Sequence, residues 1–292
     1  MGIFVQLLIN GLIAGAIYAL VSSGFSLIYS TCKFIHFAHG GVIAFGAYFL
    51  YFLFSMVGLN FGFSVVLSII FAALLGLGLN QLYNQLRKRN ASNVIILIAS
   101  FAVMILLESL ILIFFNADVK TLGYIKVAKG LEVLGGIITP LQIFIVATSL
   151  VLLGLLLLLM KKTKIGKAMR AVSDNKDVAE IVGISSKKIY NWSFIIGSAI
   201  AGIAGILIGL EQNLEPVMGS TIIIKGFTGA IIGGIGSVPG AILGSFLLGI
   251  VENFGIWFLP SGYKDAIAFV LLFVFLLFKP TGILGIKKGA KK

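Results

Sequence analysis

Long apolar stretches recur from one end of this sequence to the other, and they limit its fold more than any other feature. Runs of roughly 20 apolar residues can cross the hydrocarbon core of a bilayer as α-helices. The short alternating segments of a membrane β-barrel are absent. We therefore predict an all-α polytopic membrane protein with about 8–9 transmembrane segments. The expected spans are roughly 3–30, 37–59, 62–86, 93–116, 140–160, 190–212, 220–238, 240–259 and 263–281.

The charged residues indicate an orientation. Only 11% of the residues are charged, whereas a soluble domain has about 25%, and the net charge is +12. Such an excess would suggest nucleic-acid binding in a soluble chain, but here basic loops on the cytoplasmic side explain it better. If the polar loop 161–189 is inside, 17 of the 22 lysines and arginines share that side. We expect the N-terminus outside, the C-terminus in the cytoplasm and no nucleic-acid partner.

Motifs of enzymatic chemistry are missing from the sequence. The single cysteine, Cys32, allows neither an internal disulfide nor a cysteine-based metal cluster. No GxxxxGK[ST], HExxH or GxSxG motif occurs. We expect no catalytic residues, no metal and no cofactor in this chain. An intramembrane enzyme using His36, His39 and Glu108 is the weaker alternative.

Glycine is abundant, with 36 residues, and its densest clusters lie at 40–46 and 226–240. Many of these glycines are four residues apart, a spacing that lets helices pack closely in lipid. Clusters of this kind also occur where broken helices line a substrate path. On that second interpretation, the candidate path residues are His36, Phe37, His39, Gly40, Gly46, Gly229, Gly233, Gly236 and Glu108.

The glycine clusters also suggest an internal repeat. Gly15 precedes Gly40 by 25 residues, and Gly205 precedes Gly229 by 24. In the expected orientation the first four spans start outside, the last four start inside, and the fifth connects them. This pattern predicts an inverted 4+4 repeat, as many transporters have, although chance spacing of glycines is an alternative.

Ionisable side chains inside apolar segments need polar surroundings. His36 and His39 are one helical turn apart, and we expect them to donate hydrogen bonds to carbonyls freed by a helix break at Gly40–Gly41. A proton relay is the alternative, and two histidines alone are too few ligands for a metal. Glu108 and Glu252 fall within expected spans, so each should face protein or water.

The loop 161–189 has the signals of one short helix. Asp174 can cap its N-terminus, with Asp177 three residues later, and Gly183 suits a left-handed residue after its end. The apolar positions on one face are Val178, Ile181 and Val182. Such a helix either rests on lipid head groups or docks into a groove of a cytoplasmic partner. The acidic residues favour docking.

Three blocks of this sequence resemble a known family. The segment GKAMRAVSDNKDVAEIVGISSKKIYNWSFIIGSAIAGIAGIL is similar to the coupling loop of the permeases of branched-chain amino-acid ABC importers, specifically the shorter of the two paired permeases. NGLIAGAIYALVSSGFSLIYSTCKFIHFAHGGVIAFGAYF resembles the N-terminal signature of that family, and KGFTGAIIGGIGSVPGAILG its late glycine-rich signature. The blocks follow in order and cover nearly the whole chain.

The resemblance implies a single permease domain over 1–292 in a bacterial or archaeal inner membrane. It also implies a complex with a second permease, two ABC ATPase subunits and an extracytoplasmic substrate-binding protein that delivers branched-chain amino acids. The residues matching the ATPase-facing loop are Gly166, Arg170, Ala171, Asp174, Asn175, Ala179, Gly183 and Ile184. Relatives usually have Asn in place of His36, and often an acidic residue in place of Gly41. Urea, short amides or other small solutes stay open as cargo, as does gradient-driven transport.

Overall fold

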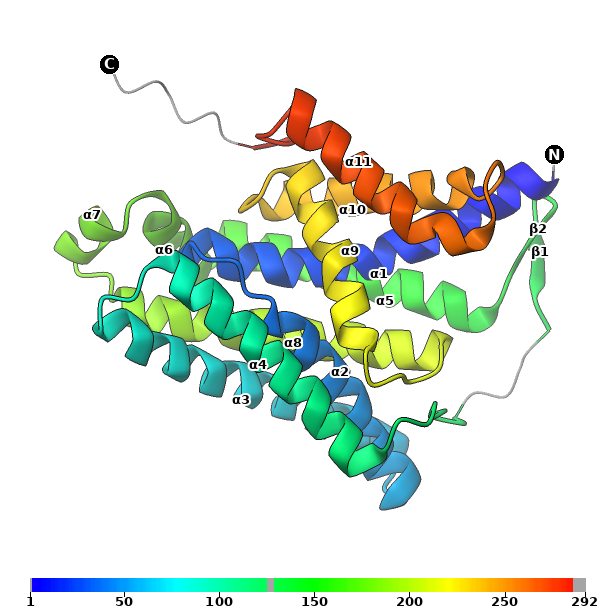
Figure 1. Ribbon diagram of the computed structural model, residues 1–292, viewed down its shortest axis with the longest axis horizontal. Helices are drawn as coiled ribbons and strands as arrows, with labels where there is room; N and C mark the ends of the chain where they lie inside the picture. Colours follow the sequence, from blue (N-terminus) through cyan, green and yellow to red (C-terminus); the bar gives the residue numbers. More distant parts are fainter. Residues whose placement is uncertain (1, 125–128, 286–292) are drawn as a thin grey trace. The chain divides into compact units, whose positions relative to one another are not determined.

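The computed structural model describes residues 2–124 and 129–285, and these residues are almost entirely helical (Figure 1). The chain forms two compact units: Met1–Leu27, Lys129–Leu157 and Ile224–Lys292 form unit 1, and Ile28–Ala128 and Leu158–Ile223 form unit 2. The α-helices are α1 (Gly2–Cys32), α2 (Ala38–Tyr51), α3 (Phe61–Lys88), α4 (Asn93–Phe115), α5 (Pro140–Lys162), α6 (Lys164–Asp174), α7 (Lys176–Ile181), α8 (Ser186–Glu211), α9 (Met218–Gly233), α10 (Val238–Gly255) and α11 (Lys264–Phe278).

Eight helices in the described part of the chain are long and apolar enough to cross a membrane. They are α1, α2 with its π-helical extension η1 (Phe52–Met56), α3, α4, α5, α8, α10, and α11 with the preceding 3-10 turn η2 (Ser261–Tyr263). The expected all-α polytopic membrane architecture is therefore confirmed. The seventh expected span, 220–238, corresponds to α9, which has only 16 residues, ends at Gly233 and is not among the eight.

Unit 2 is built around α2, which packs against α3, α4 and α8. Most residues of α2 are buried, and its small side chains let the neighbouring helices approach closely. A Cβ atom on Gly46 would lie 2.7 Å from the Cα of Gly202 in α8, closer than real side chains allow. In Figure 1, α3 and α8 run side by side, in agreement with their extensive contact.

In unit 1, the first part of α1 packs against α10, and α11 covers α10 (Figure 1). Glycines again form the contact: a Cβ on Gly11 would lie 2.9 Å from the Ile250 Cα. The hydroxyls of Ser22 and Ser245 share a hydrogen bond of 2.6 Å across the same interface. In unit 2, Gly205, which is four residues from Gly209, likewise packs against the Ile43 backbone. Glycines spaced four apart therefore serve helix packing in both units, as the simpler interpretation of the sequence predicts.

Two elements were not anticipated from the sequence. A short antiparallel hairpin joins β1 (Leu131–Val133) to β2 (Gly136–Ile138) in unit 1, and Gln6 of α1 holds it. The Gln6 Nε2 donates to the Ile137 carbonyl at 3.1 Å, and the Ile137 N–H donates to Gln6 Oε1 at 2.7 Å. The second element is α6, which precedes the short helix expected in the 161–189 loop.

The end of α9 is completed by a distant part of the chain. Gly234 and Gly236 have φ values of 114° and 87°, so the chain reverses there, and Ser237 caps α10. The N–H groups of Ile283 and Leu284 donate to the carbonyls of Ile232 and Gly233, at 2.9 and 2.8 Å. The C-terminal segment thus supplies donors for carbonyls that a helix end leaves without partners.

Candidate functional site

The short helix α7 is closed at both ends by local hydrogen bonds. The side chain of Asn175 accepts from the N–H groups of Asp177 (3.0 Å) and Val178 (3.1 Å), so Asn175 is the N-cap. The prediction that Asp174 caps this helix was wrong, because Asp174 is the last residue of α6. A helix break of one residue separates α6 from α7, and only the side chain of Asn175 reaches the free N–H groups.

The C-terminal end of α7 is confirmed as predicted. Gly183 has a φ of 86°, its N–H donates to the Glu180 carbonyl at 3.0 Å, and the Ile184 N–H donates to the Ala179 carbonyl at 2.9 Å. This pair of bonds is the Schellman arrangement, which favours glycine at the left-handed position. Helix α7 is too short to be stable alone, so these two closures fix its shape.

An apolar edge of α7 has no partner in the described residues. Val178, Ile181 and Val182 are 54%, 83% and 68% exposed. Ala179, on the opposite side, is buried, and the Ser186 hydroxyl donates to the Glu180 carboxylate, which ties α7 to the start of α8. The result is a projecting helix with an exposed apolar tip and acidic neighbours, which suits a protein groove better than anionic lipid.

Helix α6 anchors this projection to unit 2. Thr163 caps α6 by accepting from the Gly166 N–H at 3.0 Å, and Met169 and Val172 are buried in its contact with α8. A Cβ on Gly166 would lie 2.6 Å from the Met160 Cα, so glycine permits the close turn from α5 into α6. The eight residues matched to the coupling loop thus fall on α6, on α7, at its N-cap Asn175 and at the two positions after its C-cap, Gly183 and Ile184; Arg170 is exposed.

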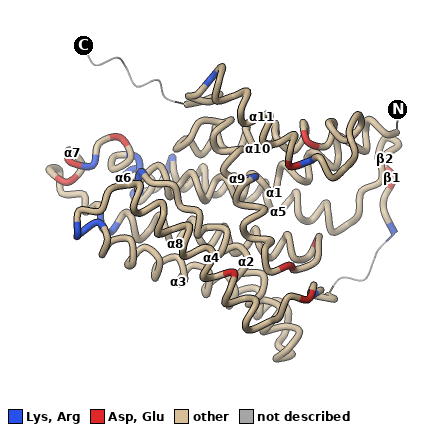
Figure 2. The backbone as a smooth tube through the Cα atoms, in the orientation of Figure 1, with Lys and Arg blue, Asp and Glu red and all other residues tan. Residues whose placement is uncertain are grey.

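The basic residues of unit 2 gather at the same end. Figure 2 shows lysines and arginines around α6, α7 and the turn between α3 and α4. Arg87 and Lys88 lie in the last turn of α3, and Arg89 is its C-cap. The basic tail residues Lys287, Lys288, Lys291 and Lys292, which also entered the predicted orientation, lie outside the described residues, as does Lys126.

His36 and His39 lie near the start of α2, and both are completely buried. Their ring centroids are 6.0 Å apart, and His36 also contacts the rings of Tyr83 (5.4 Å) and Phe194 (5.0 Å). Neither ring nitrogen of His36 has a hydrogen-bond partner among the described residues. Burial and then the neighbouring His39 lower the pKa of His36 well below 6.5. The ring is therefore neutral near pH 7.

The expected helix break at Gly40–Gly41 is not found. Both glycines lie inside α2, which is continuous from Ala38 to Tyr51. They are needed for packing: a Cβ on Gly40 would collide with the carbonyl oxygen of Gly219, and one on Gly41 with the side chain of Leu107. The interruption in this region lies at 33–37, where Lys33 has a φ of 57°. The expected hydrogen bonds from His36 to freed carbonyls are not found among the described residues.

The second glycine cluster does contain a break. Gly229 and Gly233 lie within α9, whereas Gly236 lies in the turn that follows it. Gly229 packs against Ser245, and Gly233 against Gly240. The positive φ of Gly236 meets the expectation of irregular backbone, but only at the end of the cluster.

Glu108 of α4 makes one defined contact within unit 2. Its Oε1 accepts from the Ser220 N–H at 3.1 Å. Ser220 is in the first turn of α9, where backbone N–H groups lack helical partners and a negative charge is favourable. Of the two interpretations open from the sequence, a fixed hydrogen bond between helices is the one this contact supports.

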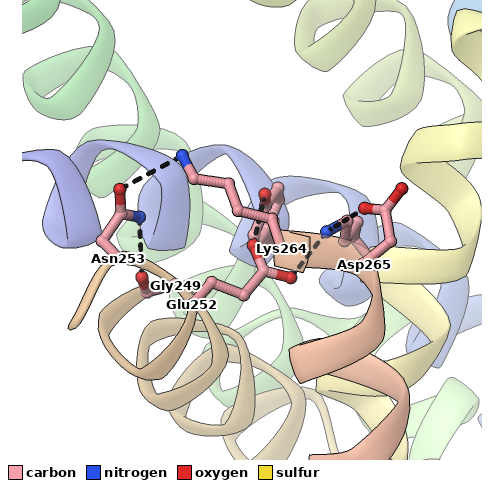
Figure 3. A network of polar contacts seen from close by, with 7 residues as sticks. Gly249, Glu252, Asn253, Lys264 and Asp265 are labelled. Atoms are coloured by element: carbon pink, nitrogen blue, oxygen red, sulfur yellow. Dashed lines mark hydrogen bonds and ion pairs between the residues drawn. The ribbon is translucent and has the colours of Figure 1, made fainter. Parts of the chain in front are cut away.

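Sequence reasoning missed an ion-pair network in unit 1 (Figure 3). Lys225 Nζ is 2.7 Å from Glu252 Oε1 and 2.7 Å from Asp265 Oδ1. The Tyr18 hydroxyl donates to Glu252 Oε2 at 2.9 Å. Lys264 Nζ donates to Asn253 Oδ1 at 3.4 Å. The sequence does contain a signal for this network. Lys225 and Glu252 lie in neighbouring apolar spans, where each needs a polar partner, so an ion pair between them could have been predicted.

Helices from three parts of the sequence contribute to this network. Lys225 comes from α9, Glu252 from α10 and Asp265 from α11. Lys225 and Glu252 are buried, while the Asp265 side chain is 64% exposed. The network therefore links α9, an apolar helix of 16 residues, to α10 and α11 by charge.

Comparison with known proteins gives a consistent result. Residues 7–276 match the family model described as branched-chain amino acid transport system / permease component. The chain is 36% identical to the high-affinity branched-chain amino acid transport system permease protein BraD of Pseudomonas aeruginosa PAO1, over 97% of this chain and 96% of that protein. It is 31% identical to the permease LivH of Escherichia coli K12, with the same coverage.

A solved structure has a similar fold. PsaBC from Streptococcus pneumoniae, in complex with Fab, aligns with a TM-score of 0.51 over 93% of this chain and 91% of that chain. The sequence identity is 13%, so this likeness concerns the fold alone.

Proposed function

Because this chain belongs to the family of permease components of branched-chain amino-acid transport systems, we propose that it is a membrane-spanning subunit of an ATP-driven importer of aliphatic amino acids. The near-complete coverage of BraD and LivH supports this function. The cargo is a small zwitterion with an apolar side chain. Urea and short amides are the alternative cargo, since nothing in the chain's own residues distinguishes them.

The projecting helix α7 is the feature that carries the mechanism. Its apolar tip is exposed in the part of the chain that the structure describes, and the side chain of Ile181 is 83% exposed. We propose that this tip enters a groove of a separate ATPase subunit, so that the movement of the ATPase upon ATP hydrolysis pulls on α6 and α8. A closed, rigid helix transmits displacement, and both ends of α7 are closed by hydrogen bonds.

The other subunits follow from the same proposal. The chain has no phosphate-binding GxxxxGK[ST] loop, so hydrolysis belongs to two ATPase subunits, and the chain needs no cofactor of its own. A second permease completes the pathway, and an extracytoplasmic binding protein delivers the solute. The basic end of unit 2 favours the cytoplasmic side of a bacterial or archaeal inner membrane for α6 and α7, with the N-terminus outside.

The test uses the complete transporter reconstituted in vesicles. Substitution of Ile181 by Gln should abolish most solute uptake while the ATPase subunits still hydrolyse ATP, because the exposed tip loses apolar contact with its partner. The control is Leu134→Gln, which changes an 86% exposed apolar residue of unit 1 and should leave uptake unchanged. Undiminished ATP-dependent uptake by the Ile181 variant would refute the docking role. Uptake by this chain alone without nucleotide would instead indicate gradient-driven transport.

A further inference from the structure

A polar cavity of about 580 Å³ lies in unit 2, where α1 and α3 end and α4 begins. The segment joining α6 to α7 forms another side of it. The charged and amide side chains that line the cavity are Lys33, Arg87, Asn90, Asn93, Asp174, Asn175 and Lys176. The cavity is therefore rich in hydrogen-bond donors and lies beside the segment that leads into α7.

Arg87 is held rigidly in the wall of this cavity. Its guanidinium lies over the ring of Tyr190, 4.6 Å from the centroid, and 5.2 Å from that of Phe34. Nη2 donates to the Cys32 carbonyl at 3.1 Å. Stacking on two rings and one hydrogen bond fix the plane of the group, so its remaining N–H donors point in set directions.

One donor group of Arg87, Nη1, lacks an acceptor in the described part of the chain. Nη1 is buried and has no hydrogen-bond partner among the described residues, and no carboxylate forms an ion pair with Arg87 there. A buried donor without an acceptor is costly, and more so when it is charged. A ligand that brings acceptor oxygens into the cavity would remove this cost.

The net charge of the side chains that line the cavity indicates whether such a ligand is an anion or a cation. Lys33, Arg87 and Lys176 contribute three positive charges, while the exposed Asp174 contributes one negative charge. Lys88 and Arg89 add further positive charge at the same end of α3. The local field therefore favours an anion, and an arginine fork with amide neighbours suits the oxygens of a phosphate.

We propose that this cavity binds a phosphate group, as carried by the head group of an anionic phospholipid. The cavity lies where candidate spans end, at Cys32 and Lys88, and where the next begins, at Asn93. Span ends lie at the depth of lipid head groups, and basic pockets between transmembrane helices bind anionic lipids there. Free phosphate offers the same chemistry from solution. None of the candidate solute-path residues lines this cavity, so its occupant is independent of the cargo.

The experiment measures the thermal stability and bound lipid of the full chain in neutral detergent. Phosphatidylglycerol is compared with phosphatidylcholine, whose choline group offsets the phosphate charge, and native mass spectrometry counts retained lipid. Phosphatidylglycerol should raise the melting temperature and remain bound, and phosphatidylcholine should do so far less. A separate arm replaces lipid by inorganic phosphate, against chloride at equal ionic strength.

Substitutions of the lining residues test whether phosphatidylglycerol acts by binding in this cavity. Arg87→Gln should weaken binding roughly tenfold, as expected for loss of a hydrogen bond to a charged group, and Arg87→Lys should recover part of it. Arg89→Gln is the matched control, because Arg89 is exposed on the same turn and does not line the cavity. If Arg87→Gln does not fold, Lys176→Gln, at an exposed lining position, takes its place.

The outcomes separate the two sources of phosphate. Stabilisation by lipid that depends on Arg87 or Lys176 assigns a head group, and equal stabilisation by inorganic phosphate assigns a soluble ligand; both support the site. The proposal is overturned if the variants bind phosphatidylglycerol as well as the wild type does. It is also overturned if phosphatidylcholine matches phosphatidylglycerol and inorganic phosphate has no effect.

Discussion

The ammonium of Lys225 lies 2.7 Å from Glu252 Oε1, with both side chains buried, and 2.7 Å from the exposed carboxylate of Asp265. Lys225 is thus shared between the buried Glu252, for which it is the counterion, and the exposed Asp265, which water can also solvate. The Lys225–Glu252 and Lys225–Asp265 ion pairs should therefore contribute differently to the free energy of unfolding. A buried charge that loses its partner is far more costly than an exposed one.

Lys225→Met should therefore lower the free energy of unfolding by roughly 3–5 kcal/mol, because Glu252 loses its buried counterion. Asp265→Asn should cost only about 0–1 kcal/mol. Denaturant titration in detergent measures both values. The double variant Lys225→Met/Glu252→Gln should be more stable than Lys225→Met alone. Equal losses for Lys225→Met and Asp265→Asn would contradict this assignment.

Gly46→Ala should destabilise unit 2 by roughly 1–3 kcal/mol, because the added methyl group meets the Gly202 Cα and forces α2 away from α8. Gly78→Ala in α3 is the control, since a Cβ there meets no atom within 4 Å. This control should be neutral or slightly stabilising, by up to about 1 kcal/mol, as alanine favours helix. The melting temperature in detergent distinguishes the two. A Gly46 variant as stable as the control would argue against the close contact.

Asn175→Ala should destabilise α7 locally by about 1 kcal/mol, the usual cost of losing an N-cap. The amides of Asp177 and Val178 lose their acceptor and should exchange faster with deuterium. Asp174→Ala should leave these rates unchanged, because the Asp174 side chain does not cap α7. Faster exchange in the Asp174 variant instead would restore the interpretation that the sequence alone favoured.

The stability of the chain should fall as the pH is lowered through about 6.5, in part because of His36. Its pKa is below 6.5 in the folded state, by burial first and His39 second, so the unfolded state takes up the proton more readily. This contribution is fully present above the unfolded pKa and is lost as the pH falls towards the folded value, by at most about 1.4 kcal/mol per pH unit. Melting temperatures between pH 7.5 and 5.5 should decrease less steeply for His36→Asn. An unchanged slope would exclude His36 as a source.

Much of the fold could be predicted because hydropathy is a local property. The eight long spans and the end of α7 at Gly183 both follow from residues close together in the sequence. Glycine spacing also predicted close helix packing. The choice between Asp174 and Asn175 as cap failed because it depends on where α6 ends, and neighbouring polar residues offer equally good caps.

The parts that could not be predicted depend on contacts between distant residues. The acceptor-free ring of His36 results from packing against Tyr83 and Phe194, and no local pattern indicates which rings will surround it. The cavity around Arg87 likewise needs α1, α3, α4 and α8 together. The inverted repeat and the solute path stay predictions, since they concern relations beyond either unit.

The closure of α9 by Ile283 and Leu284 has a consequence for how the chain matures. The carbonyls of Ile232 and Gly233 emerge from the ribosome well before the two residues that satisfy them. Until then, these two carbonyls need other hydrogen-bond donors, from water or from the insertion machinery. A nascent chain stopped before Ile283 contains all eight candidate spans but lacks the donors that complete α9, so this docking contact can form only after the spans have been synthesised.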